Sequence, residues 1–251
     1  MPDTEAEMRQ AFTYLLIVQK VIQAPHRRLE KFNDGHRLKR TCSYPILDGD
    51  SHIPQARPLP MLALQELSCP NIRDTLYKHV SAVVGDGHQV QAWATVYFRT
   101  IHPWLPVISN TCYFDRLQPA KIASEPADFC LLNLTMYLVC TKPVNGELSP
   151  KAQSLYLLVK SLVGTLEAVG ITSIEMLQSR LLITIFEVGN SLYSAAYISS
   201  GANIRAAIEL GINAASSEQL QTLLGSPTQI EEAQRTWRAI VVIDRSVHSY
   251  P

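Results

Sequence analysis

Residues 172–213 constrain the fold of this chain more than any other stretch, because they predict two consecutive helices. Thr172 and Glu175 have the spacing of a capping box, which satisfies free amide groups at a helix start. Apolar residues then recur at helical spacing as far as Gly189, where the pattern breaks. The sequence therefore predicts one helix over residues 172–189 and, after a short break, another.

The second helix, predicted over residues 191–210, is rich in small side chains. It ends at Gly211, a residue suited to the left-handed turn that follows a helix. Alanine, serine and glycine leave little bulk along this segment, so neighbouring backbones could approach it closely. We therefore expect this helix in the middle of a helical bundle. Four larger side chains would supply its contact area, namely Tyr193, Tyr197, Ile204 and Ile208.

Helical spacing of apolar residues continues through the rest of the chain from Met61. Gly85, Asp86 and Gly87 mark a turn, and no alternating strand pattern with hairpin turns interrupts the helical one. Periodicity alone would also allow a buried strand within residues 129–140. The prediction is an all-α fold whose helices pack in an irregular bundle. Further helices are expected within residues 62–80, 89–101, 110–117, 129–140, 155–169 and 228–241.

Residues 1–60 differ in character from the remainder of the chain. Residues 5–23 predict an amphipathic helix, and the stretch from residue 20 to residue 40 is rich in lysine and arginine. That stretch is either a nuclear-import or phosphate-contact segment or a solvated linker, and we favour the linker because its charges are diluted. Proline-containing residues 41–60 predict a loop. We expect a boundary here, between residues 1–60 and a helical domain over residues 61–251.

The charge balance and the cysteines exclude several classes of protein. Lys+Arg 22 against Asp+Glu 22 gives the chain no global electrostatic reason to bind nucleic acid or membrane. None of the five cysteines is paired at the short spacing of a metal site, so we expect reduced, mostly buried thiols and no cofactor or metal in this chain. Neither a secretory signal nor a membrane span is present, which predicts a cytosolic or nuclear protein.

A catalytic interpretation of His102 is weaker than a structural one. His102 could act as a general base with Cys112 or Asp115 nearby in sequence. A histidine directly before a proline that ends a helix is more often structural, however, and we favour that role. We likewise expect Trp93 and Trp104 to belong to the core rather than to a ligand cage. The chain is therefore not expected to be an enzyme.

Three blocks of sequence resemble, in order and rough spacing, the fungal-specific transcription factor domain. This is the helical middle homology region found after binuclear zinc-cluster DNA-binding domains. The first block covers residues 97–108, the second residues 201–211 and the third residues 235–245. The positions that match the family's motifs, taken as structural or regulatory and not catalytic, are Tyr97, Phe98, His102, Pro103, Trp104, Pro106, Gly201, Arg205, Leu210, Gly211, Trp237, Asp244 and Arg245.

The resemblance implies a nuclear regulatory domain that controls transcription through intramolecular contacts. Because no cysteine spacing here can build the family's zinc cluster, DNA would be reached only indirectly, and zinc would be needed only if such a cluster lies upstream. The third block resembles the middle of the family's module, so we expect the domain to be incomplete at its C-terminus. A homodimer, a transcriptional co-regulator or a small-molecule effector are the partners that it suggests. The alternative is a stand-alone interaction module, or a cofactor-like regulator, without DNA binding.

Arg205 is the second-block position that carries a specific structural hypothesis. It interrupts an otherwise small and apolar helix, so it either pairs with a buried carboxylate or is simply exposed. Asp244 is the first candidate partner, because it falls close to the apolar stripe of the last helix. Glu209, four residues further along the same helix, is a weaker one.

Overall fold

The structure is a computed structural model, and it describes residues 69–118, 124–141, 148–213 and 217–247. These residues form nine helices and contain no strand, which confirms the all-α prediction. The predicted helix over residues 5–23, the basic stretch and the expected boundary at residue 60 lie outside the described residues. The helices are α3 (Cys69–Val83), α4 (Gly87–Thr100), α5 (Asn110–Arg116), α7 (Ala127–Val139), α8 (Pro150–Ala168), α9 (Ile174–Gly189), α10 (Tyr193–Glu209), α11 (Ser217–Leu224) and α12 (Pro227–Val247).

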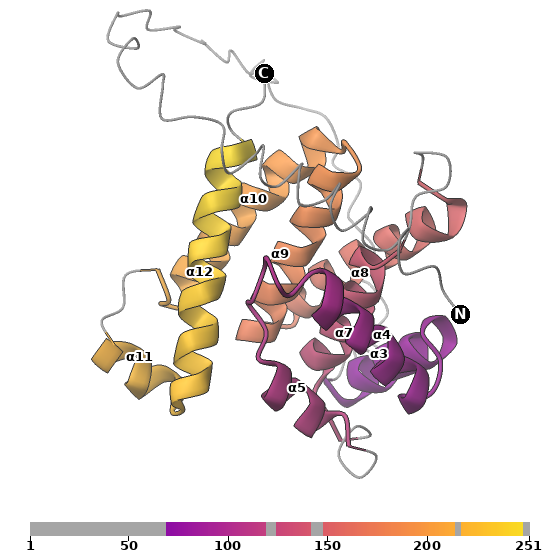
Figure 1. Cartoon of the computed structure of the whole chain (residues 1–251), viewed down its shortest axis with the longest axis horizontal. Coiled ribbons are helices and arrows are strands. Elements are labelled where there is room, and N and C mark those ends of the chain that lie inside the picture. Colours follow the sequence, from indigo (N-terminus) through magenta and orange to yellow (C-terminus); the bar gives the residue numbers. More distant parts are fainter. Residues whose placement is uncertain (1–68, 119–123, 142–147, 214–216, 248–251) are drawn as a thin grey trace, which may run out of the picture.

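The central helix of the bundle is α9. It contacts α7, α8, α10 and α12, and every residue from Met176 to Val188 is buried apart from Arg180. In Figure 1, α12 lies along one side of α9, while α7, α4 and α3 lie on the other. Helix α7 is also buried along its whole length, as expected of a helix that is apolar on all sides. The core therefore forms around α7 and α9.

Helix α10 does not occupy the middle of the bundle as its sequence suggested. Its small face is buried, through Ala196, Ser199, Ser200, Asn203 and Ala207, and it contacts α9 and α12. Small side chains let these two helices approach closely, so the larger residues are turned outward. The prediction that they all supply contact area is wrong for Tyr193, Tyr197 and Ile208, which are 43%, 55% and 52% exposed.

The helix ends follow local signals, with two corrections to the predicted caps. Asp86 and Gln89 form a complete capping box at the start of α4, and Gly211 has the expected left-handed backbone, with φ of 71°. At α9, however, the cap is Ser173 and not Thr172, because the hydroxyl of Ser173 accepts the Met176 amide over 3.1 Å.

The cap of α12 lies two residues before the predicted one. Thr228 and Glu231 have the spacing of a capping box, which predicts Thr228 as the cap, but Ser226 Oγ accepts the hydrogen bond of the Gln229 amide over 3.2 Å. Pro227 takes the first helical position, where its missing N–H costs nothing, and this moves the start of the helix forward.

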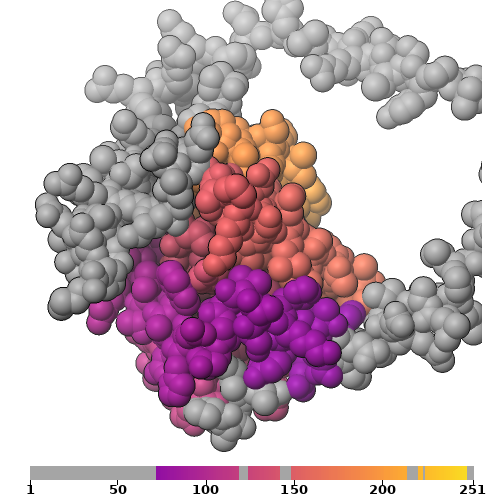
Figure 2. Space-filling view, turned by 90° about the vertical axis from the view of Figure 1, so that its right-hand side faces the viewer, coloured from indigo at the N-terminus to yellow at the C-terminus, as the bar shows by residue number. Residues whose placement is uncertain are grey.

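On the face seen in Figure 2, α3 and α4 form the indigo and purple surface below, and red residues from the middle of the chain lie above them. Helix α3 packs on α7, and so does α4. Among the described helices, none combines the length and the apolar composition that crossing a bilayer requires.

Candidate functional site

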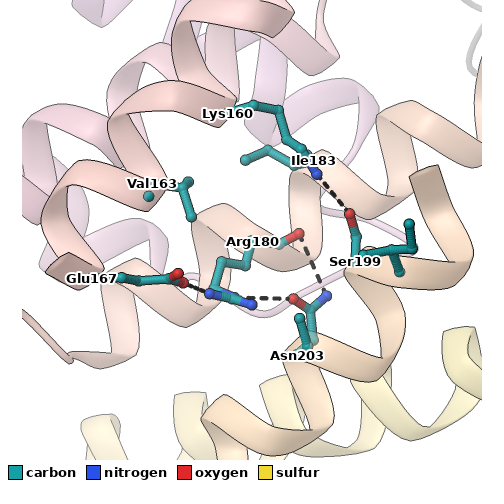
Figure 3. Close-up of a pocket in the computed structure, with 10 residues that line it drawn as sticks. Lys160, Val163, Glu167, Arg180, Ile183, Ser199 and Asn203 are labelled. Atoms are coloured by element: carbon teal, nitrogen blue, oxygen red, sulfur yellow. Dashed lines mark hydrogen bonds and ion pairs between the residues drawn. The ribbon is translucent and has the colours of Figure 1, made fainter. Parts of the chain in front are cut away.

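A cleft of about 200 Å³ opens between α8, α9 and α10 (Figure 3). Its walls are apolar at Val163, Ile183 and Ile198, whereas polar and charged side chains from all three helices meet within it. Because each helix contributes to the lining, the shape of the cleft depends on how these helices are placed. The polar and charged lining residues are Lys160, Glu167, Arg180, Ser199 and Asn203.

A buried carboxylate next to this cleft joins the three helices. Glu187 of α9 is completely buried, and its Oε1 accepts hydrogen bonds from Lys160 Nζ over 2.9 Å and from Tyr156 Oη over 2.7 Å. Lys160 Nζ also donates to Ser199 Oγ of α10 over 2.9 Å. Burial, and then the hydrogen bond to Glu187 and its charge, raise the pKa of Tyr156. A buried charge is costly unless it is paired, so this network fixes the relative placement of the helices.

The Glu187 network is not fully satisfied. Its second oxygen, Oε2, is buried without a hydrogen-bond partner in the described part of the chain. Such a group costs free energy in this arrangement.

Arg180 forms the second polar connection across the cleft. Its Nε donates to Asn203 Oδ1 over 3.2 Å, its guanidinium pairs with Glu167, and Asn203 Nδ2 donates to Thr184 Oγ1 over 2.9 Å. Figure 3 shows Arg180 lying between Glu167 and Asn203. Burial, and secondly the charge of Arg205, lower the pKa of Arg180.

The cleft presents mainly hydrogen-bond donors to a ligand. An ammonium group has three protons, of which Lys160 directs two to Glu187 and Ser199, and a guanidinium has five. Oxygen acceptors such as carbonyl or carboxylate groups fit this arrangement better than a metal ion does. Within the described residues, no group of three or more His, Cys, Asp and Glu side chains is placed to hold a metal.

The first block of the resemblance is built around an aromatic cluster. Phe98 lies 5.1 Å from the His102 ring and 5.5 Å from the Tyr113 ring, measured between centroids. Tyr97 is fully buried, and its hydroxyl has no hydrogen-bond partner among the described residues. Burial is the main cause that lowers the pKa of His102. These contacts give His102 a packing role, whereas Cys112 is exposed on α5.

The structure brings the first block against the third. Arg235 Nη1 of α12 donates to the Pro106 carbonyl over 3.4 Å, and Trp104 Nε1 donates to Thr100 O over 2.9 Å. A second hollow, of about 260 Å³, lies where residues 104–107 meet α12. Sequence order alone did not predict this contact.

The structure decides between the two hypotheses for Arg205, and it is exposed. Its Nη1 lies 3.5 Å from where a β-carbon of Gly201 would be. Asp244, the first candidate partner, accepts a hydrogen bond from Ser200 Oγ over 2.6 Å. Ser200 directly precedes the second block and Asp244 belongs to the third, so this hydrogen bond joins the neighbourhoods of the two blocks.

The remaining motif positions lie at the edge of the core or on the surface, and their regulatory role remains a prediction. Pro103, Pro106 and Arg245 are exposed, and Gly201, Leu210 and Trp237 are partly buried. The expectation of mostly buried thiols holds for Cys130, while Cys140 is partly buried and Cys112 is exposed. Burial raises the pKa of Cys130 to about 11 and that of Cys140 to about 12. Cys42 and the Cys69 side chain lie outside the described residues.

Sequence reasoning missed the residues of the cleft. Glu187 directly follows the longest apolar run, so one charge in a helical core position was visible. Such a position usually needs a partner, which is the signal that could have found Glu187, whereas Lys160 lies off the apolar stripe of α8 and gave no such signal. Ser199 and Asn203 gave no comparable signal, because serine and asparagine are ordinary in a small-residue helix.

Comparisons with known proteins agree with the three blocks. Residues 94–250 match the family described as fungal specific transcription factor domain. A curated relative, transcription factor BOA15 from Botryotinia fuckeliana (strain B05.10), is 34% identical over 139 residues, which cover 55% of this chain and 76% of the relative. No solved structure matches the chain. The chain belongs to the fungal specific transcription factor domain family and contains its transcription-regulating helical domain.

Proposed function

We propose that this chain acts in the nucleus as an effector-responsive regulator and not as an enzyme. It would reach DNA only indirectly, through a zinc-cluster module of the kind found in this family, and would need no cofactor of its own. The helical domain, which we place at residues 61–251, would change its output when a small molecule binds between α8, α9 and α10. Family membership supports the transcriptional role.

The observation that carries the proposal is the polar network under the cleft. Lys160, Glu187 and Ser199 come from three different helices, and Lys160 contacts both of the others over 2.9 Å. A ligand that competes for the Lys160 ammonium would weaken its contacts with α9 and α10 together.

A ligand acts on such a network only if it binds one arrangement of the helices better than another. A molecule bearing a carboxylate or carbonyl group would accept hydrogen bonds from Lys160 and Arg180, while Val163, Ile183 and Ile198 would contact its apolar part. The favoured arrangement would then be the one that holds the ligand. We therefore expect a small, partly apolar acceptor molecule rather than a cation.

The proposal can be tested by filling the cleft from its exposed rim. Ile198 lines the cleft and is 68% exposed, so Ile198→Trp should occupy the space without disturbing the core. Leu157→Trp is the matched control, because Leu157 is 60% exposed on α8 and does not line the cleft. Each variant is fused to an unrelated DNA-binding domain, and reporter transcription is measured with extracts of fungal metabolites.

Ile198→Trp should abolish the response to the extracts, while Leu157→Trp keeps it. Binding is followed on the purified chain by the increase in Tm that a carboxylate library produces, again lost only in Ile198→Trp. If both variants respond alike, the cleft is not the effector site. If neither the chain nor its variants change reporter output, transcriptional regulation by this domain is itself in doubt.

A second candidate function is a stand-alone interaction module, in line with the exposed apolar side chains of α10. Ile198 and Ile208 are 68% and 52% exposed, which is unusual for large apolar residues. A homodimer or a co-regulator would cover them. Sedimentation of the chain and of Ile208→Glu distinguishes these cases, since only a dimer through α10 would dissociate in the variant.

A further inference from the structure

The cleft between α8, α9 and α10 has a charged contact at each of its two ends. At one end Lys160 of α8 pairs with Glu187 of α9, and at the other Glu167 of α8 pairs with Arg180 of α9. The two residues of α8 are seven positions apart, and so are the two of α9, in the opposite order along the chain. The charged ends are therefore roughly 10 Å apart along the helix axes. Figure 3 shows Lys160 and Arg180 at these two ends.

The middle of the cleft is apolar and is kept open by a glycine. Val163 and Gly164 of α8, Ile183 of α9 and Ala202 of α10 line it between the two charged contacts. A β-carbon added to Gly164 would meet no atom within 4 Å, and the backbone there does not have the positive φ that favours glycine. Glycine is less favourable than alanine inside a helix, so Gly164 weakens α8 and leaves space in the cleft.

The end of the cleft at Arg180 is suited to a carboxylate. Arg205 is exposed on α10, and it lies near enough for its charge to lower the pKa of Arg180, after the larger effect of burial. Against these guanidinium groups, the acidic side chain among the residues that line the cleft is Glu167, which is 42% exposed. An ion pair with so exposed a carboxylate contributes little, so a ligand carboxylate can replace it on the guanidinium.

The opposite end is suited to a neutral oxygen group. The positive charge of Lys160 is already balanced by Glu187, which is fully buried. The ammonium donates to Glu187 and Ser199, which leaves one of its three protons for a ligand, and 36% of the Lys160 side chain is exposed. A second ligand carboxylate here would be repelled by Glu187, whereas a hydroxyl or carbonyl oxygen would accept the remaining proton without that repulsion.

We propose that the effector of this cleft is a carboxylic acid that carries a neutral hydroxyl or carbonyl group at the other end of a short apolar chain. Its carboxylate would bind Arg180, its chain would contact Ile183, and its second oxygen would accept from Lys160. Ser199 and Asn203, the α10 partners of the two cations, are four positions apart, so the ligand would span roughly 6–10 Å. The inference rests on the proposed function, since it specifies which ligand that cleft binds.

Acids of equal chain length test the two ends separately. Caproate has a methyl group opposite its carboxylate, ω-hydroxycaproate has a hydroxyl group there, and adipate has a second carboxylate. Dissociation constants are measured by NMR titration of the full chain. We expect ω-hydroxycaproate to bind roughly two- to tenfold more tightly than caproate, the gain from one net hydrogen bond. Adipate should bind no more tightly than caproate, because its second charge would lie close to Glu187.

Charge variants identify the end that holds the carboxylate. Arg205→Gln should weaken binding of all these acids by roughly two- to fivefold, as expected for loss of one exposed charge. Glu167→Gln should strengthen it, because the competing carboxylate is gone. Asp115→Asn is the matched control, since Asp115 is exposed on α5 and does not line the cleft. The preference for the hydroxyl group should be the same in every variant, because it arises at the Lys160 end.

Gly164→Leu separates this inference from the proposed function. The added side chain should fill the open middle of the cleft and abolish binding of every acid. If caproate and ω-hydroxycaproate bind equally and Gly164→Leu blocks both, the cleft remains an acid-binding site but the proposed ligand class is wrong. Binding that survives Gly164→Leu, or no binding of any acid, would overturn both the ligand class and the cleft as its site.

Discussion

Ser200 of α10 donates its hydroxyl proton to Oδ1 of Asp244 in α12 over 2.6 Å. Ser200 is almost fully buried, so this hydrogen bond joins two packed helices inside the protein. We expect Ser200→Ala to lower the free energy of unfolding by about 1.5–3 kcal/mol, the range for a hydrogen bond to a charged group. Urea denaturation measures the change, with the exposed Ser154→Ala of α8 as the control. A loss equal to that of the control would show that this hydrogen bond adds nothing to the stability of the domain.

Removal of the Lys160 charge should destabilise the domain more than removal of both charges. Lys160→Met leaves the Glu187 carboxylate buried without its cation, and we expect a loss of about 3 kcal/mol. This is the low end of the range for a broken buried pair, because 36% of the Lys160 side chain remains exposed to water. The double variant Lys160→Met with Glu187→Leu should recover much of the loss. A double-mutant cycle in urea gives the coupling, and purely additive losses would contradict the pairing.

Two glycines of the second block should respond in opposite directions to alanine. Gly201 lies within α10 with no atom closer than 3.5 Å to an added β-carbon, so Gly201→Ala should stabilise the domain by about 0.5–1 kcal/mol. Gly211 has φ of 71°, and Gly211→Ala should cost about 1 kcal/mol because alanine is strained there. Thermal denaturation checks both. If Gly201→Ala raises Tm yet lowers reporter output, the glycine serves the approach of a partner.

Acidification should weaken the fold through His102. Burial and the charge of Arg235 hold the pKa of His102 below its usual 6.5, against a hydrogen bond to the Ile108 backbone that raises it. The folded state thus prefers the neutral imidazole. The contribution of His102 to the free energy of unfolding is therefore present above pH 6.5 and is lost as the pH falls through the folded pKa. The loss should stay below about 1 kcal/mol, because the ring is partly exposed and screened by water.

His102→Gln is the comparison for this pH effect. The variant should lose less stability than the wild type between pH 7.5 and pH 5 when both are denatured in urea. Burial raises the pKa of Glu232, so this residue changes the stability with pH in the opposite direction. Its effect is the same in both proteins and cancels in the comparison. Parallel stability profiles would mean that His102 titrates as it does in the unfolded chain.

Helices were predictable from sequence because their signals are local. Glycine at residue 211, the turn at residues 85–87 and the spacing of apolar residues each act within a few neighbours, and the structure places helices where they indicated. Helix α11 was not predicted. Cap positions at α9 and α12 were missed by one and two residues. In both cases a serine, and not the predicted threonine, accepts a backbone amide of the first helical turn.

The candidate site was not predictable in the same way. Lys160 and Glu187 are 27 residues apart, and Arg180 and Asn203 are 23 apart, so each pair depends on how two helices cross. The exposure of Tyr197 and Ile208 also depends on helix packing. The face of α10 that carries small residues packs against α9 and α12, so these two side chains point away from the core.

By itself, the sequence determined that this protein is all-α, where most of its helices end and to which family it belongs. Those properties rest on local spacing and on ordered motifs. Only the tertiary structure decided that Asp244 accepts a hydrogen bond from Ser200, that Arg205 is exposed, and that Glu187 pairs with Lys160. The physical reason is that long-range polar pairs are selected by the angle and distance at which helices pack, and neither quantity is encoded within one helix.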